Sequence, residues 1–134
     1  MPETFNYWIS GNYWGSPGYE ANRPTSVGDY ESKLKADIWA GGPANSPGYP
    51  LAGAVEEVPG QIHLWGHPTS LDIQHWIVLY GYQSSGYYTS YADPAAGSPL
   101  NWPVSAYNPY WLSSDMYTLI SDSHNGHGPG GIVW

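Results

Sequence analysis

The most hydrophobic part of the chain lies in its middle and consists of two runs. Aromatic and β-branched residues fill Gln74–Tyr82 and Tyr87–Pro94, and the short segment Gln83–Gly86, rich in Gly and Ser, separates them. Two β-prone runs around such a break predict a β-hairpin. Antiparallel pairing across the break places position 75 opposite position 94, within one residue.

His75 and Asp93 mark the outer ends of this hairpin, so the pairing brings their side chains close together. A register shift of one residue would move one of them to the other face of the sheet. A β-bulge at Gly81 or Gly86 would correct such a mismatch. Two interpretations stay open: the base half of a nucleophilic triad, in which a carboxylate orients a histidine, or a structural histidine beside an Asp-Pro turn.

A helix is predicted over Thr25–Ala40. Its apolar residues recur at every fourth position and form one stripe: Tyr30, Leu34 and Ile38. Ser26 and Asp29 have the spacing of a capping box, with Asp in place of the usual Glu. The segment Gly41–Pro43 is expected to end the helix.

The remaining elements are shorter. Strands are predicted over Leu51–Val58 and Gln61–Trp65, where apolar residues are bounded by Gly and Pro. Residues 94–112, rich in Pro, Asn and Tyr, are expected to form a loop. Ser113 is a candidate cap for a short helix near the carboxyl end.

These elements predict one α+β domain spanning residues 1–134, with an irregular segment over 1–24. The expected fold is a curved antiparallel sheet of about four to six strands, one main helix and a short carboxy-terminal helix. The 17 Gly and 13 Pro favour long loops and few helices. The length suits a single modest core.

The acidic net charge argues against binding to nucleic acid or to anionic membranes. Three cationic residues stand against 11 acidic ones, for a net charge of −8, so the chain offers no basic patch for nucleic acid or for anionic membranes. No run approaches the roughly 18 apolar residues of a membrane span. There is no cysteine and hence no disulfide framework. Few lysines and many Tyr, Trp, Gly and Asn are typical of secreted bacterial proteins, and an extracellular location is expected.

Three stretches resemble the C39-like cysteine peptidases of the papain-like superfamily. They are Gly48–Gly53, His75–Tyr82 with the pattern HWIVLYGY, and Tyr91–Pro94 with the pattern YADP. The resemblance extends from about residue 27 to residue 121. It implies a hydrolase of peptides or proteins, in which His75 is the general base and Asp93 orients it.

The chain departs from that family in one essential respect. The family's amino-terminal helical half carries a Cys-Gly-Pro motif and an oxyanion-hole glutamine, and neither motif occurs here. The resemblance therefore covers the sheet-bearing half alone, and residues 1–24 are expected to begin after the helical half. Ser10 and Ser16, the candidate substitutes for the nucleophile, stand in no matching motif. We expect the chain to be inactive alone and to need a cysteine-bearing helical partner.

Two other functions stay open. The first is a non-catalytic, peptidase-like module that acts in binding or in self-assembly into dimers or filaments, through a face left uncovered by the missing half. The second is a carbohydrate-binding domain that uses stacked aromatic rings. Aromatics make up 16% of the chain, including 8 Trp and 13 Tyr, and supply both alternatives.

Further polar residues surround the predicted His75–Asp93 pair. Trp76, His63, His67 and Gln74 are expected to line a substrate or partner groove beside it. A zinc site would need His63, His67, Asp72 and His75 to converge. Gly66 and Pro68 disfavour the helix that would align the first two histidines, so no metal or other cofactor is expected.

The geometry of His75 separates the catalytic from the structural interpretation. In a triad, Asp93 should lie near one imidazole nitrogen of His75 while the other nitrogen faces open space. In a structural role, both nitrogens should find partners inside the protein.

Overall fold

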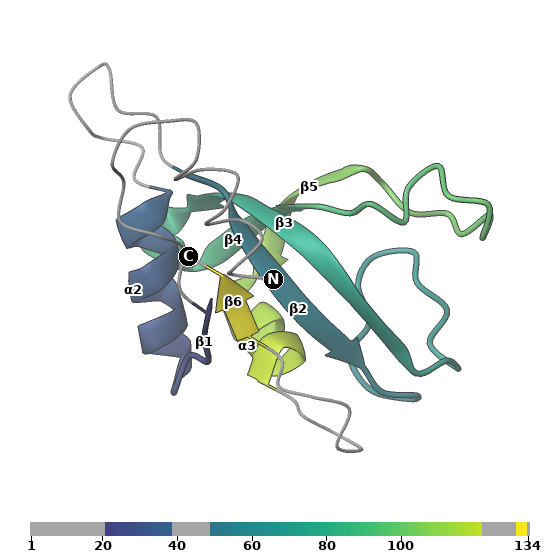
Figure 1. Cartoon of the computed structure of the whole chain (residues 1–134), viewed down its shortest axis with the longest axis horizontal. Coiled ribbons are helices and arrows are strands. Elements are labelled where there is room, and N and C mark those ends of the chain that lie inside the picture. Colours follow the sequence, from purple (N-terminus) through teal and green to yellow (C-terminus); the bar gives the residue numbers. More distant parts are fainter. Residues whose placement is uncertain (1–20, 39–48, 122–130, 134) are drawn as a thin grey trace.

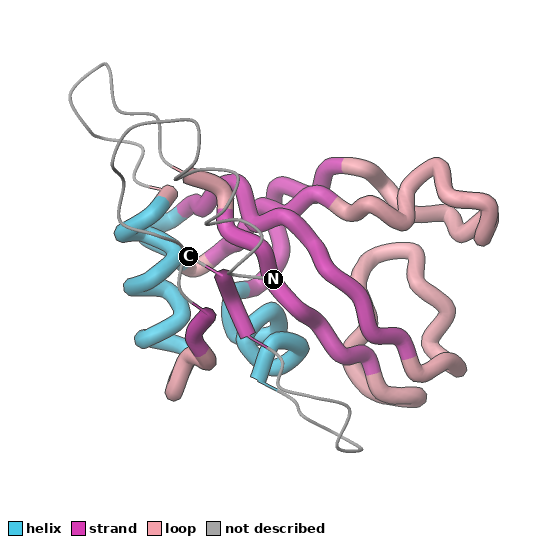
Figure 2. Tube along the Cα trace, in the orientation of Figure 1, coloured by secondary structure: helices cyan, strands magenta, loops and turns pink. Residues whose placement is uncertain are grey.

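The computed structural model describes residues 21–38, 49–121 and 131–133 (Figure 1). Five antiparallel strands form an open sheet in the order β6-β2-β3-β4-β5, and a two-residue strand, β1, pairs with the free edge of β6. Two helices complete an α+β fold (Figure 2). The elements in chain order are β1 (Ala21–Asn22), α2 (Val27–Asp37), β2 (Leu51–Glu57), β3 (Ile73–Gln83), a 3₁₀ turn (Ser84–Gly86), β4 (Tyr88–Ala92), β5 (Tyr107–Leu112), α3 (Ser113–Ser121) and β6 (Gly131–Val133).

Helix α2 begins where its capping residues predict. Ser26 is the N-cap, and its hydroxyl accepts a hydrogen bond from the Asp29 backbone N–H at 3.1 Å. The Asp29 carboxylate accepts from the N–H of Thr25 at 2.8 Å, one residue before the cap, so the reciprocal bond of a capping box is displaced by one position. The helix ends at Asp37, before the predicted end at Ala40. Residues 39–48, which include the predicted stop signal, lie outside the described residues.

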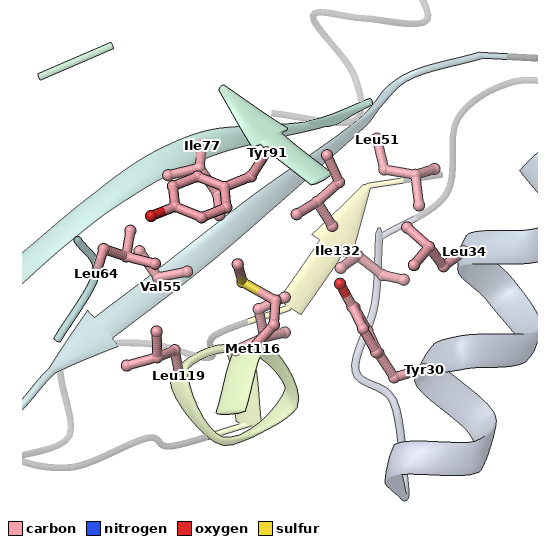
Figure 3. Close-up of a cluster of buried hydrophobic side chains, with 12 residues drawn as sticks. Tyr30, Leu34, Leu51, Val55, Leu64, Ile77, Tyr91, Met116, Leu119 and Ile132 are labelled. Atoms are coloured by element: carbon pink, nitrogen blue, oxygen red, sulfur yellow. The ribbon is translucent and has the colours of Figure 1, made fainter. Parts of the chain in front are cut away.

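Both helices pack on one face of the sheet and form the hydrophobic core (Figure 3). The buried side chains of the core come from α2, β2, β3, β4, α3, β6 and the segment after β2: Tyr30, Leu34, Leu51, Val55, Leu64, Ile77, Leu79, Tyr91, Met116, Leu119, Ile120 and Ile132. A Cβ at Gly53 would lie 3.5 Å from the Ile120 Cδ1 atom. The missing side chain thus lets α3 approach the middle of β2 closely.

A chain of buried hydroxyl groups ties α2 to α3 across the core. The Tyr30 hydroxyl lies 2.9 Å from the Thr89 hydroxyl, which lies 2.8 Å from the Ser113 hydroxyl. Ser113 also donates to the carbonyl of Gly86. Its side chain therefore fastens the start of α3 to the hairpin, whereas the sequence suggested a helix cap.

The predicted hairpin is present, and so is a bulge at Gly81. Near the turn, Gln83 pairs with Tyr88 and Gly81 with Ser90, but beyond a register shift Leu79 pairs with Tyr91. The extra residue in β3 changes which side chains share a face. Because of it, the odd-numbered residues of β3 from Ile73 to Leu79 lie on the same face as Tyr91 and Asp93.

Three local predictions were wrong. Ala21–Asn22, within the segment 1–24 that was expected to be irregular, forms β1, and residues 1–20 lie outside the described residues. Gln61–Trp65 is not a strand but part of the loop over residues 58–72, where the side chain of His63 bonds backbone carbonyls of the same loop. Tyr107–Leu112, predicted to be loop, forms β5. This strand contains Pro109, which cannot donate to a ladder, and it is tolerated because β5 lies at the edge of the sheet.

Neither described helix has the length and hydropathy of a membrane span.

Candidate functional site

Four titratable side chains from four segments meet at one end of the core face. Glu57 ends β2, His75 lies near the start of β3, Asp93 follows β4, and His67 comes from the loop over residues 58–72. We call these four residues the polar cluster. The side chains of Glu57, His67 and Asp93 are 0% exposed, and that of His75 is 18% exposed.

Each imidazole of the polar cluster lies between the two carboxylates. His67 Nδ1 is 2.6 Å from Glu57 Oε1, and His67 Nε2 is 3.0 Å from Asp93 Oδ2. His75 Nε2 is 3.4 Å from the same Glu57 Oε1, and His75 Nδ1 is 3.9 Å from Asp93 Oδ1. The two rings are tilted against each other, with centroids 4.9 Å apart. His67 is therefore held tightly and His75 loosely by the same pair of acids.

Backbone donors hold both carboxylates in place. Glu57 Oε2 accepts a hydrogen bond from the N–H of Leu64 at 2.9 Å, and Asp93 Oδ1 accepts from the N–H of Ala95 at 2.8 Å. Leu64 belongs to the loop over residues 58–72 and Ala95 to the loop over residues 93–106; we call these two the covering loops. Folding of these loops thus supplies part of the stabilisation that a buried carboxylate requires.

The charges of the cluster stabilise one another. Burial by itself raises the pKa of Glu57, but the nearby imidazoles of His67 and His75 outweigh it and lower the pKa to about 2. Burial also opposes ionisation of Asp93, and the contact with His67 and the Ala95 N–H lower its pKa. Burial lowers the pKa of His67, whereas Asp93 and Glu57 raise it to about 9. At neutral pH both acids are ionised and His67 carries a proton.

Several polar atoms of the cluster have no aligned hydrogen-bond partner among the described residues. They are His67 Nε2, His75 Nε2 and Asp93 Oδ2, all buried. The 3.0 Å contact between His67 Nε2 and Asp93 Oδ2 is close enough for an ion pair but is not aligned as a hydrogen bond. Unsatisfied atoms of this kind are costly and concentrate where a protein binds or reacts.

The two covering loops meet at Gly66. Its φ of +84° favours glycine, and a Cβ at this position would overlap the carbonyl group of Pro103. The ring of Trp102 packs beside His67, with centroids 5.0 Å apart. The loop over residues 58–72 is closed internally, because His63 Nε2 lies 2.9 Å from the carbonyl oxygen of Leu71. These contacts fix the position from which His67 enters the site.

The structure brings His75 and Asp93 together, and the bulge at Gly81 is the reason. The triad interpretation required open space at the second nitrogen of His75, and this condition is not met, because Nε2 is buried 3.4 Å from Glu57 Oε1. The structural interpretation required a hydrogen-bond partner for each nitrogen, and Nε2 has none that is aligned among the described residues. The carboxylate of Glu57 was not foreseen as a site residue. Residue 57 is an even number of positions from the buried residues 51, 53 and 55 of β2, so strand alternation places all four on the same face. This alternation could have identified Glu57 as a residue of the core face.

Of the four residues expected to line a groove, His67 belongs to the polar cluster. His63 uses its ring nitrogens within its own loop. Gln74 and Trp76 alternate with His75 along β3 and so lie on the other face, where Gln74 donates to Glu56 at 3.2 Å. Of the histidines and the aspartate considered for zinc, His67 and His75 converge, and Asp72 is not a member of the cluster.

No protein-family model, curated protein or solved structure matches the chain. Two carboxylates and two imidazoles in one buried cluster can position a proton acceptor, and they can also coordinate a cation.

Proposed function

We propose that this chain is the sheet-bearing half of a C39-like cysteine peptidase site of the papain-like type. In this proposal His75 is the general base and Asp93 orients it. The nucleophilic thiol comes from outside these 134 residues, because they contain no cysteine. The substrate class is a peptide or protein.

One observation carries the proposal. The β-bulge between Leu79 and Gly81 places His75 and Asp93 on one face of the sheet, with Nδ1 and Oδ1 3.9 Å apart. Without the extra residue the alternation of β3 would direct one of them to the opposite face. A bulge that aims a side chain beside a site is a common device, and the motifs around both residues are those that resemble the peptidase family.

The unequal contacts of the two histidines support different roles for them. His67 is fixed by short contacts of 2.6 and 3.0 Å, whereas the contacts of His75 are 3.4 and 3.9 Å, and the side chain of His75 is partly exposed. A general base must turn toward its proton donor, so the loosely held ring suits that role. His67 and Glu57 then act as positioning residues: Glu57 holds His67, and His67 holds Asp93.

The proposed reaction follows the usual order for a cysteine peptidase. The thiol proton moves to a nitrogen of His75, and the thiolate attacks the scissile carbonyl carbon. The imidazolium then donates its proton to the leaving amine, and water hydrolyses the resulting thioester with His75 as base. For the first step, the ring must turn one nitrogen away from Glu57 toward the thiol.

Complementation tests the proposal. The chain is mixed with the cysteine-bearing helical half of a C39-like peptidase, in the presence of a metal chelator, and peptide hydrolysis is measured. We expect no hydrolysis by the chain alone. We expect hydrolysis by the mixture that a thiol-alkylating reagent blocks and that His75→Ala lowers by several orders of magnitude.

Glu56→Gln is the matched control, because Glu56 lies next to Glu57 but contacts Gln74 on the other face. This variant should leave hydrolysis unchanged. Hydrolysis by the chain alone in the presence of chelator, or full activity of the mixture containing His75→Ala, would refute the proposal.

A second candidate function is self-association or partner binding without catalysis, and exposed apolar residues favour it. Trp76, Val78 and Tyr80 project from β3 on the side away from the core and are exposed; we call them the outer face of β3. Tyr107 packs edge-on against Tyr80 and is also exposed. Adjacent exposed apolar side chains are typical of interaction surfaces.

Carbohydrate binding has less support. The late aromatic residues contact different partners: Trp102 contacts His67, Trp111 contacts Tyr91, Tyr107 contacts Tyr80, and Tyr110 contacts Tyr88. Their rings do not form one flat stacking platform of the kind that sugar recognition uses.

A further inference from the structure

Glu57 Oε1 is the common neighbour of both imidazoles of the polar cluster. It lies 2.6 Å from His67 Nδ1 and 3.4 Å from His75 Nε2. The donor atoms that these three residues offer lie within 4.8 Å of one another. Two ligands of one tetrahedral zinc ion lie roughly 3.3 Å apart, so the second distance fits and the first must widen by less than about 1 Å.

Asp93 occupies the opposite side of both rings. Its Oδ2 atom is 3.0 Å from His67 Nε2, and its Oδ1 atom is nearest His75 Nδ1 at 3.9 Å. A histidine that binds a metal through one nitrogen usually directs the other nitrogen to a carboxylate, which fixes the ring and its tautomer. Each ring of the cluster thus has one nitrogen toward a shared ligand oxygen and the other toward an orienting carboxylate.

The charges of the cluster also suit a divalent cation. Two buried carboxylates carry two negative charges, so a divalent ion that displaces the proton of His67 would leave the set neutral. His75 Nε2 is buried without a hydrogen-bond partner among the described residues. Coordination would satisfy this atom.

We infer that Glu57, His67 and His75 bind a divalent first-row transition metal of the Zn²⁺ class, with Asp93 as the residue that orients both imidazoles. Two histidines and one glutamate are a ligand set of zinc sites that keep a fourth position open. A water molecule or another ligand would complete the coordination at this fourth position. This inference departs from the sequence-based expectation of no metal, because the sequence did not reveal Glu57 as a neighbour of the histidines.

Metal binding and general-base catalysis exclude each other at His75. A metal on Nε2 leaves Nδ1 beside Asp93, so neither nitrogen can accept a proton from a thiol. Zn²⁺ should therefore inhibit the complemented peptidase. The inference itself rests on the cluster and is tested on the chain alone, whereas the peptidase assay contains chelator, so either proposal can fail without the other.

The test is Zn²⁺ binding to the full chain after removal of metal, measured by competition with a chromophoric chelator. We expect one saturable site. Glu57→Gln, His67→Ala and His75→Gln should each weaken binding by at least ~100-fold, because each removes a ligand. Asp93→Asn should weaken it by about 10- to 100-fold, the usual effect of losing an orienting partner.

Two control variants make the test specific. Glu56→Gln, on the opposite face of β2, should keep the wild-type affinity. A His124→Ala/His127→Ala variant removes the two histidines outside the described residues and should keep the single site. Co²⁺ added in place of Zn²⁺ should give a visible d–d spectrum that His75→Gln alters.

Circular dichroism of each metal-free variant checks its fold. His75→Gln keeps the test decisive if the buried variants unfold, because His75 is partly exposed and makes no aligned hydrogen bond through Nε2. Three results would overturn the inference: no saturable Zn²⁺ binding, equal affinity of a folded His75→Gln or Glu57→Gln variant and the wild type, or loss of the site in the His124→Ala/His127→Ala variant.

Discussion

The two ends of the core face of the sheet share their strands but differ in chemistry. At one end, Leu51 and Leu79 lie under helices α2 and α3 and contribute to a hydrocarbon core. At the other end, Glu57, His75 and Asp93 lie under two loops and form a charged cluster with His67. The alternation of the strands decides which side chains enter the core face. The covering element decides which chemistry that face can hold.

Helices and loops differ in the backbone N–H groups that they can donate to buried carboxylates. The N–H groups inside a helix are used by the helix itself, so α2 and α3 present apolar side chains to the sheet. Backbone N–H groups in a loop are not all used by regular hydrogen bonding, and those of Leu64 and Ala95 donate to the carboxylates of Glu57 and Asp93. Buried charges are therefore tolerated at the loop-covered end, where each finds a partner.

The largest expected effect lies at the helix-covered end. Leu79 is 0% exposed, so Leu79→Ala should lower the free energy of unfolding by about 2–5 kcal/mol through lost burial and the cavity left behind. Its neighbour Val78 is 42% exposed on the outer face of β3, and Val78→Ala should cost less than about 1 kcal/mol. Urea denaturation measures both. Equal losses would show that the two faces of β3 are not distinct.

The next effect concerns the contact between the covering loops. Gly66→Ala places a methyl group against the Pro103 carbonyl and strains a positive φ, which should cost roughly 1–3 kcal/mol and displace His67. Gly60 also has a positive φ, but no described atom lies within 4 Å of the place where its Cβ would stand. Gly60→Ala should therefore cost about 1 kcal/mol and leave His67 in place.

Nuclear magnetic resonance of the His67 ring, together with thermal unfolding, compares the two glycine variants. We expect the ring signals to move in Gly66→Ala and to stay in Gly60→Ala. Unchanged His67 signals in a folded Gly66→Ala variant would mean that the loop contact does not position the site.

The smallest effect on stability is expected on the outer face of β3. Trp76→Ser together with Tyr80→Ser should change the free energy of unfolding by no more than about 1 kcal/mol, because both side chains are exposed. The same double variant should reduce self-association, since it removes apolar area from the proposed contact surface. Light scattering measures this against the monomer mass of 14.7 kDa. A wild-type chain that stays monomeric at high concentration would contradict the association proposal.

Local sequence signals predicted the elements that depend on local interactions. The cap at Ser26 and the buried positions Tyr30 and Leu34 follow from spacing within one helix. The hairpin follows from two β-prone runs and their break, and Gly81 was one of two candidate positions for the bulge. Signals of this kind failed for β5, because Pro109 indicates a loop unless the strand is known to lie at an edge.

Only part of the polar cluster could be predicted from the sequence. His75 and Asp93 could be paired from the sequence because a hairpin joins them directly. Glu57 and His67 come from β2 and from a loop, and no local pattern relates them to the pair or to each other. The distances between them are products of packing.

The sequence by itself determined the periodicity of each element and the hairpin that joins His75 to Asp93, because alternation, caps and turns act over a few residues. The tertiary structure alone decided that Glu57 and His67 enter the same site and bury the second nitrogen of His75. Such contacts depend on the order of strands in the sheet and on the meeting of two loops at Gly66 and Pro103. Both are set by the free energy of the whole packed molecule, to which distant segments contribute jointly.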